Sequence, residues 1–357
     1  MFDMTPSNKP ANHPKVAFGK TGVLMINLGT PSGTDYWSMR RYLSEFLSDK
    51  RVIEYPRAIW QPILQLMILT KRPFTAGQAY RSIWMEEADE SPLAYYTRET
   101  ATGMTERFGD QLVFDYAMRY GDPAIEDRLI AMKDAGCDRI LILPLYPQYS
   151  AATTGTVVDK VCDTLKKMRW QPAIRVVPSF HDHPVYIREI AAGILDTAAR
   201  LTHKPDRVLL SFHGVPQSYL KKGDPYHCFC QVTARLVGQE LSQHGLETEI
   251  SFQSRFGPEE WLQPYSADRF KEMPGEGVKH LLVASPGFVA DCVETLEEIA
   301  DEGREDFMEA GGESFTFSPC LNISENAFRL YGEIIKTELA GWVDVHTEQR
   351  TPVLQVV

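Results

Sequence analysis

The sequence contains no run of about 20 apolar residues, so it offers no candidate for a segment that crosses a bilayer. Its first 15 residues lack the apolar stretch of a signal peptide. Only six of the 357 residues are cysteines, and none form a C-x-x-C pair. This scarcity excludes a dense disulfide framework and predicts reduced thiols. We therefore expect a cytoplasmic protein.

Basic residues are outnumbered by acidic ones, 37 to 48, which gives a formal net charge of -11. A nucleic-acid surface needs a basic footprint, so we expect no nucleic-acid partner. Several catalytic signatures are also missing: a Walker A loop, a G-x-S-x-G elbow and an H-E-x-x-H pair. The turn Asn27–Pro31 contains one glycine and is not a G-x-G-x-x-G dinucleotide fingerprint.

Short apolar runs alternate with helix-like segments along most of the chain. Near-continuous apolar runs are typical of parallel strands that are covered on both faces. The alternation predicts βαβ units. We expect strands at 23–28, 113–118, 140–145, 174–179, 208–212, 248–252, 281–285 and 315–317. Helices are expected at 125–135, 155–168, 184–201, 231–244 and 325–342.

The eight expected strands divide into two similar sets of four. In each half the first strand ends in a glycine followed closely by a proline. We predict two Rossmann-like, doubly wound domains with mainly parallel four-stranded sheets and a cleft between them. The N-terminal domain would span 21–179 with the returning segment 322–342, and the C-terminal domain 180–321. The tails 1–20 and 343–357 are expected to be mobile.

His213 lies in the run SFHGVP at 211–216, directly after an expected strand. Open α/β sheets bind their ligands at the carboxyl ends of strands. An imidazole there can act as a base near neutral pH. The alternative is a structural histidine whose ring is satisfied by hydrogen bonds.

An acidic run follows the seventh expected strand. A rotation of about 100° per residue places Asp291, Glu294, Glu298 and Glu302 on one helical stripe. Like charges four residues apart repel each other, and no basic residue occurs in this run before Arg304. One interpretation is a path for a hard divalent cation. The other is the solvated face of an acidic protein.

The segment 58–70 is strongly apolar and is flanked by Arg57, Lys71 and Arg72. It suits either a helix lying in a membrane interface or a buried helix of the first domain. Arg119 ends the second strand, where it can hold a carboxylate. Aromatic side chains at or near strand ends that can wall a flat ligand are Tyr146, Tyr149, Trp261 and Phe288.

Four motifs together resemble the ferrochelatase family. They are SFHGVP at 211–216, DCVETLEEI at 291–299, YPQYS with TTG between 146 and 155, and GDPY at 223–226. The resemblance covers about residues 22–331. It implies two Rossmann-like domains, a C-terminal helix that returns to the first domain, and insertion of Fe²⁺ into protoporphyrin IX to give haem.

The resemblance also implies roles for individual residues. His213 and Glu294 would be catalytic, and Glu298 and Glu302 would join them in handling the metal. The porphyrin would contact Leu28, Arg119, Tyr120, Trp261, Phe288 and Asp291, and we add Tyr149 from its place in the YPQYS motif. The apolar segment 56–70 would be the lip through which many members meet the membrane, which makes the enzyme peripheral on the inner face.

Two departures from animal members bear on cofactors. Cys292 stands where they have a histidine. Ala151 stands at one of their four [2Fe–2S] cluster cysteines, and no cysteine follows Cys320. We therefore expect no animal-type cluster and no cofactor beyond the Fe²⁺ substrate. The C-x-C pair Cys228 and Cys230, with Cys320 or Cys292, leaves open a cluster of another kind.

Three other functions remain as alternatives. A chelatase for a more carboxylated tetrapyrrole would need a more basic cleft. A coproporphyrin ferrochelatase tends to have tyrosine where Leu28 stands. A haem carrier needs an axial ligand but no row of carboxylates, so the acidic run favours catalysis.

Overall fold

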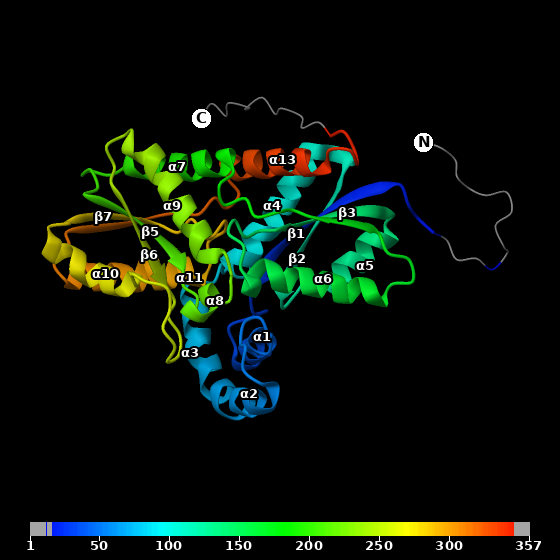
Figure 1. Cartoon of the computed structure of the whole chain (residues 1–357), viewed down its shortest axis with the longest axis horizontal. Helices are drawn as coiled ribbons and strands as arrows, with labels where there is room; N and C mark the ends of the chain where they lie inside the picture. The colour runs from blue at the N-terminus through cyan, green and yellow to red at the C-terminus, as the bar shows by residue number, and fades with distance from the viewer. Residues whose placement is uncertain (1–11, 13–15, 346–357) are drawn as a thin grey trace.

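The computed structural model describes Asn12 and residues 16–345, and it contains two four-stranded parallel sheets (Figure 1). The first sheet has the order β2-β1-β3-β4 and the second the order β6-β5-β7-β8. The predicted fold class is therefore confirmed, and the two halves share one strand order. The strands are β1 (Lys20–Gly29), β2 (Val113–Tyr120), β3 (Cys137–Pro144), β4 (Ala173–Val176), β5 (Arg207–His213), β6 (Thr248–Gln253), β7 (His280–Ala284) and β8 (Ser314–Ser318).

Helices connect the strands and cover both faces of each sheet. Figure 1 shows α7 and α13 along one side of the molecule, and α5, α6 and α10 along the other. The helices are α1 (Tyr36–Leu47), α2 (Arg57–Ile63), α3 (Leu69–Ser82), α4 (Pro92–Phe108), α5 (Ile125–Asp134), α6 (Thr156–Lys167), α7 (Pro184–Ala198), α8 (Gln217–Lys221), α9 (Tyr226–Ser242), α10 (Ser266–Glu272), α11 (Val293–Thr295), α12 (Arg304–Glu309) and α13 (Glu325–Leu339). Three π-helical segments are η1 (Leu64–Ile68), η3 (Ala151–Gly155) and η5 (Leu296–Gly303), and two 3₁₀ turns are η2 (Gly109–Gln111) and η4 (Met273–Glu276).

One apolar core runs through both halves. Val23 of β1 and Val208 of β5 belong to the same cluster of buried side chains, together with Leu330 of α13. Helix α13 packs on α4 of the first half and on α7 of the second. Arg175 of β4 donates to the carbonyl of Glu338, at 2.6 Å, at the end of α13. The final helix therefore returns to the first half, as predicted, and also joins the two halves.

The predicted mobile tails fall largely outside the described residues. Within them, β1 already begins at Lys20, and the side chain of Val345 is buried in the core. Lys20 is thus paired in the sheet and Val345 is buried, while the mobility of the tails stays a prediction. The domain boundaries remain predictions.

The segment from α1 to α3 projects from the sheets (Figure 1). Helix α2 contains no buried residue, so the interpretation of this segment as a buried helix is wrong for α2. Leu64 and Leu69 are buried in the cluster that includes Tyr120, and Trp60 and Ile68 pack against the same cluster. Large apolar side chains are more than half exposed at Ile59, Leu66, Met67 and Phe74. Within the described residues, every helix is too short or too polar to span a bilayer.

Candidate active site

His213 is the last residue of β5, and its ring is half-buried. Nδ1 lies 2.6 Å from the carbonyl oxygen of Gly214. A carbonyl oxygen only accepts hydrogen bonds, so Nδ1 must carry the hydrogen. In the neutral ring Nε2 then holds a free lone pair. The ring centroids of Trp261 and Phe288 each lie 6.4 Å from that of His213. The arrangement gives a base close to two aromatic rings.

Gly214 allows the chain after His213 to fold closely onto the neighbouring strand. Its amide donates to the carbonyl of Gln253 at 2.8 Å. A Cβ atom at position 214 would lie 2.7 Å from that carbonyl oxygen and 3.1 Å from Cε3 of Trp261. Glycine is therefore required for this close approach.

Gln253 connects the histidine strand to the acidic segment. It is the register partner of His213 in the β5–β6 pair, and only 3% of its surface is exposed. Its Nε2 donates to the carbonyl of Glu294 at 2.6 Å, and its Oε1 accepts from Ser211 Oγ at 2.8 Å. Gln253 thus links the end of the His213 strand to the backbone of Glu294. Sequence reasoning missed Gln253, because only strand register reveals its place.

Leu28 and Phe288 lie in one apolar cluster with Leu93, Ala290 and Cys292. Leu28 comes from the end of β1 in the first half, whereas Phe288 follows β7 in the second. Phe288 also lies near His213, as does Trp261, so Phe288 connects the surroundings of the imidazole to the cluster that Leu28 packs against. This cluster includes residues from both halves.

The acidic run does not form the regular α-helix assumed in the sequence analysis. After the single turn α11, it continues as the π-helix η5. Pairing of residue i with i+5 brings Glu297 beside Glu302. Burial first, and the charge of Glu302 second, raise the pKa of Glu297 to about 7. Glu297 can therefore exchange protons at neutral pH. The sequence analysis assumed an α-helix with about 100° per residue, and that geometry did not place Glu297 on the acidic stripe.

Glu298 is held by hydrogen bonds. Its carboxylate accepts from the amide of Ser254 at 2.6 Å, from the Ser254 hydroxyl, and from Gln253 Nε2 at 3.3 Å. Glu302 is exposed as a residue, but its carboxyl group is partly desolvated. This desolvation, followed by the charge of Glu298, raises the pKa of Glu302. The predicted carboxylate stripe is therefore uneven: Glu298 fastens η5 to the end of β6, while Glu302 faces outward.

Arg119 and Tyr120 lie at the end of β2 and share one partner. The Arg119 guanidinium forms an ion pair with Asp49, and the Tyr120 hydroxyl donates to the same carboxylate at 3.0 Å. Arg119 Nε also donates to the carbonyl of Thr156 at 2.9 Å. The Tyr120 ring is completely buried, so in this structure it contacts only protein.

Asp291 is buried and fully engaged by protein hydrogen bonds, whereas Tyr149 is half-buried. Asp291 is 4% exposed, and its carboxylate accepts from Thr295 Oγ1 at 3.1 Å, Asn322 Nδ2 at 2.7 Å and the amide of Cys320 at 3.3 Å. These contacts order the loop before α11. Tyr149 is half-buried beside Gly155.

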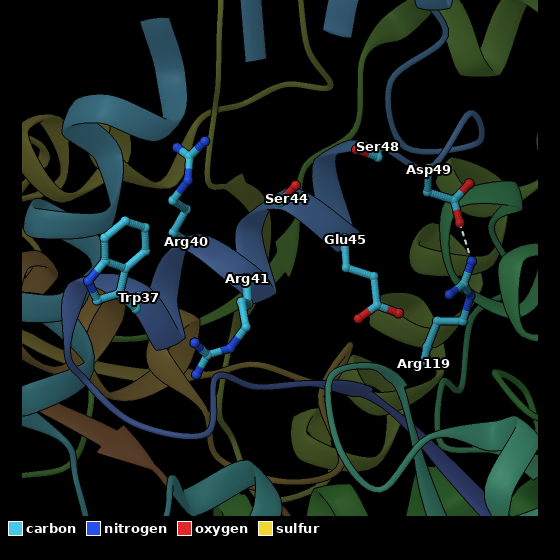
Figure 2. Close-up of a pocket in the computed structure, with 8 residues that line it drawn as sticks. All are labelled: Trp37, Arg40, Arg41, Ser44, Glu45, Ser48, Asp49 and Arg119. Atoms are coloured by element: carbon cyan, nitrogen blue, oxygen red, sulfur yellow. Dashed lines mark hydrogen bonds and ion pairs between the residues drawn. The ribbon is translucent and has the colours of Figure 1, made fainter. Parts of the chain in front are cut away.

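A hollow of about 700 Å³ opens along the polar face of α1 and reaches Arg119 (Figure 2). In Figure 2 the Asp49–Arg119 pair closes one end, and Trp37 stands at the other. Neither His213 nor Glu294 belongs to its lining. The lining residues are Trp37, Arg40, Arg41, Ser44, Glu45, Ser48, Asp49 and Arg119.

Among Asn12 and residues 16–345, no three or more His, Cys, Asp and Glu side chains converge into a group that can hold a metal ion. His213, Glu294, Glu298 and Glu302 are thus not gathered as a chelate. The alternative cluster ligands are not assembled either: Cys228 is exposed, whereas Cys230 and Cys292 are buried thiols.

The fold is that of two-domain chelatases. A solved structure of SirB from Bacillus subtilis with Fe³⁺ superposes with a TM-score of 0.54 over 90% of this chain and 96% of that one. The two sequences are 12% identical, so this likeness shows the fold alone.

Sequence comparison identifies the family within that class. The ferrochelatase family model matches residues 20–339. The ferrochelatase of Agrobacterium fabrum is 54% identical over 336 residues, which cover 94% of this chain and 98% of the relative. That of Rhodobacter capsulatus is 49% identical over 340 residues, 94% of this chain and 97% of the relative. The chain belongs to the ferrochelatase family. The predictions of an enzyme and of iron insertion for haem synthesis are thereby confirmed.

Proposed function

We propose that this chain inserts Fe²⁺ into protoporphyrin IX at the surface formed by His213, Trp261, Phe288 and Leu28. One observation carries the assignment of the site: Nδ1 of His213 is committed to the Gly214 carbonyl, so Nε2 is the free base close to two aromatic rings. Glu294, tied to the same strand end through Gln253, supplies the nearby carboxylate.

The reaction must remove two pyrrole protons for each metal ion inserted. In the proposal, His213 Nε2 accepts a pyrrole proton, and Glu294 accepts the second or receives the first from His213. Glu297 then passes protons outward, since its pKa lies at about 7. Fe²⁺ is the substrate. As it enters the ring, its carboxylate ligands are replaced by the ring nitrogens. The route could follow Glu294 and Glu302 or the His213 side.

The apolar surface would bind the faces of the macrocycle. Trp261, Phe288 and Leu28 provide apolar area, and burying it against the ring can offset bending of the macrocycle. Arg119 uses only part of its five N–H donors on Asp49 and Thr156. We propose that the remaining donors hold a ring carboxylate.

The decisive assay mixes the protein anaerobically with Fe²⁺ or Zn²⁺ and with free-base protoporphyrin, coproporphyrin or a more carboxylated tetrapyrrole. Absorbance then shows which ring is metallated. We expect protoporphyrin to react fastest. Faster reaction of coproporphyrin would replace the substrate assignment, and binding of haem without metallation of any ring would indicate a carrier.

We also propose that the predicted lip 56–70, extended here to Phe74 so that it comprises α2, η1 and the start of α3, rests on the cytoplasmic face of a membrane. Leu66 is 74% and Met67 66% exposed, and Arg57 and Lys71 beside them are exposed cations. Exposed apolar side chains with flanking cations favour insertion at the level of anionic headgroups.

This placement predicts that replacing both Leu66 and Met67 by serine weakens binding to anionic vesicles by tenfold or more. Burying each such side chain contributes roughly 1.5–3 kcal/mol. Vesicle cosedimentation measures the loss. Ile130→Ser, which alters an exposed apolar residue on α5, serves as the control and should bind like the wild type. Equal binding of the double variant and the wild type would refute the placement.

A further inference from the structure

The turn Asp49–Val52, between α1 and the lip, contacts candidate site residues of the first half. The carboxylate of Asp49 binds Arg119 and accepts from the Tyr120 hydroxyl at 3.0 Å. Its other oxygen accepts from the amide of Arg51 at 2.8 Å. Arg119 and Tyr120 are therefore fixed to the backbone of this turn.

The same turn is held from the second half by Tyr219 of α8. The phenol hydroxyl lies 2.9 Å from the carbonyl oxygen of Val52 and 3.0 Å from that of Arg51, so one hydrogen is shared between two acceptors. The side chain is 7% exposed, and burial, followed by the charge of Glu54, raises the pKa of the phenol. Tyr219 therefore remains a donor.

Tyr219 follows His213 by six residues, and backbone contacts make the chain between them rigid. The amide of Gln217 donates to the carbonyl of Glu260 at 2.9 Å, and that of Leu262 to Val215 at 3.0 Å. These bonds pair the His213 loop with the segment that carries Trp261. The segment from His213 to Tyr219 and the segment that carries Trp261 are therefore joined by backbone hydrogen bonds.

We propose that Tyr219 is a positioning residue that, through the Asp49–Val52 turn, sets the separation between His213 and Arg119. Its hydroxyl and the Asp49 carboxylate hold opposite sides of one short turn, so the two ends of the ligand surface are fixed relative to each other. The role of Tyr219 in porphyrin binding rests on the function proposed above. The hydrogen bonds that connect Tyr219 to the Asp49–Val52 turn do not depend on that function.

Tyr219→Phe removes only the hydroxyl. We expect KM for protoporphyrin in Zn²⁺ insertion to rise about five- to tenfold, as for the loss of one buried hydrogen bond. The kcat value should stay within about twofold, because the substitution alters the separation of His213 from Arg119 but leaves the imidazole, its Gly214 hydrogen bond and Glu294 in place. In hydrogen exchange without substrate, amides of residues 50–55 should exchange about threefold faster or more. A purely structural effect would lower kcat and the melting temperature without this split.

Tyr55→Phe is the matched control. Tyr55 is exposed, and its hydroxyl makes a weaker contact between the halves, 3.4 Å from Glu259, so neither KM nor exchange should change. An unchanged KM or an unchanged exchange rate in Tyr219→Phe overturns the proposal. If the wild type failed to metallate any porphyrin, the proposed function would be wrong. The hydrogen-exchange comparison needs no substrate, so it would still show whether Tyr219 holds the Asp49–Val52 turn.

Discussion

Replacing His213 by alanine should slow metal insertion by about 10²–10⁴-fold, the usual contribution of a general base. The variant loses the Nε2 lone pair that lies close to Trp261 and Phe288, and nothing else at the end of β5 can replace it. The hydrogen bond lost with the ring, from Nδ1 to Gly214, is local. The Gly214 amide keeps its bond to Gln253, so the strand end should persist.

Anaerobic Zn²⁺ insertion into protoporphyrin measures this rate, and quenching of tryptophan fluorescence measures porphyrin binding separately. We expect binding within a fewfold of the wild type, because the apolar surface remains. His244→Ala is the control, since that histidine is exposed at the end of α9. Turnover of His213→Ala close to that of the wild type would remove the imidazole from the mechanism.

The sequence predicted the parts of the fold that depend on local apolar patterns. The run at 208–212 is a fully buried strand, and the segment 125–135 differs from α5 by one residue at its end. In a near-continuous apolar run, side chains on both faces of the strand must be buried. This favours a parallel sheet with helices on both faces. Histidine 213 was located by the same logic, because strand ends gather at one edge of a sheet.

The backbone form of the acidic run was not predictable in the same way. Glu294 to Glu302 fit an amphipathic α-helix by spacing, yet the chain forms a π-helix from Leu296 to Gly303. A π-helix depends on how the segment meets its neighbours, here through the bonds from Ser254 and Gln253 to Glu298. These contacts join residues more than 40 positions apart, so no local pattern records them.

Contacts between distant segments also decide which polar residues face a ligand. Asp291 lies in the most specific motif, but Asn322 and Thr295 occupy its carboxylate, and it is buried. Tyr219 lies outside the four motifs, yet it contacts the Asp49–Val52 turn of the first half from the second half of the chain. Sequence therefore located the strand ends, whereas hydrogen-bond partners distinguish side chains that are free to react from those already occupied.

Glu294→Gln should reduce kcat about a hundredfold, or roughly 2.7 kcal/mol in the activation free energy. The side chain follows Val293, which packs against the buried cluster around Tyr42, and the charge of Glu294 adds to burial in raising the pKa of that phenol. A carboxylate in such apolar surroundings interacts strongly with a proton or cation. The amide keeps the shape and the backbone bond to Gln253 but removes this charge.

Steady-state kinetics with Zn²⁺ and protoporphyrin provide the measurement, with porphyrin binding as a second reading. Glu305→Gln is the matched control: it removes the same charge from an exposed position on α12, just beyond the π-helix, and should leave kcat unchanged. If both variants lost activity equally, the long-range field of the acidic segment would be responsible rather than a carboxylate beside the ring. If neither lost activity, Glu294 would have no part in moving protons or metal. A loss confined to Glu294→Gln would require that carboxylate to act at the reacting nitrogen atoms.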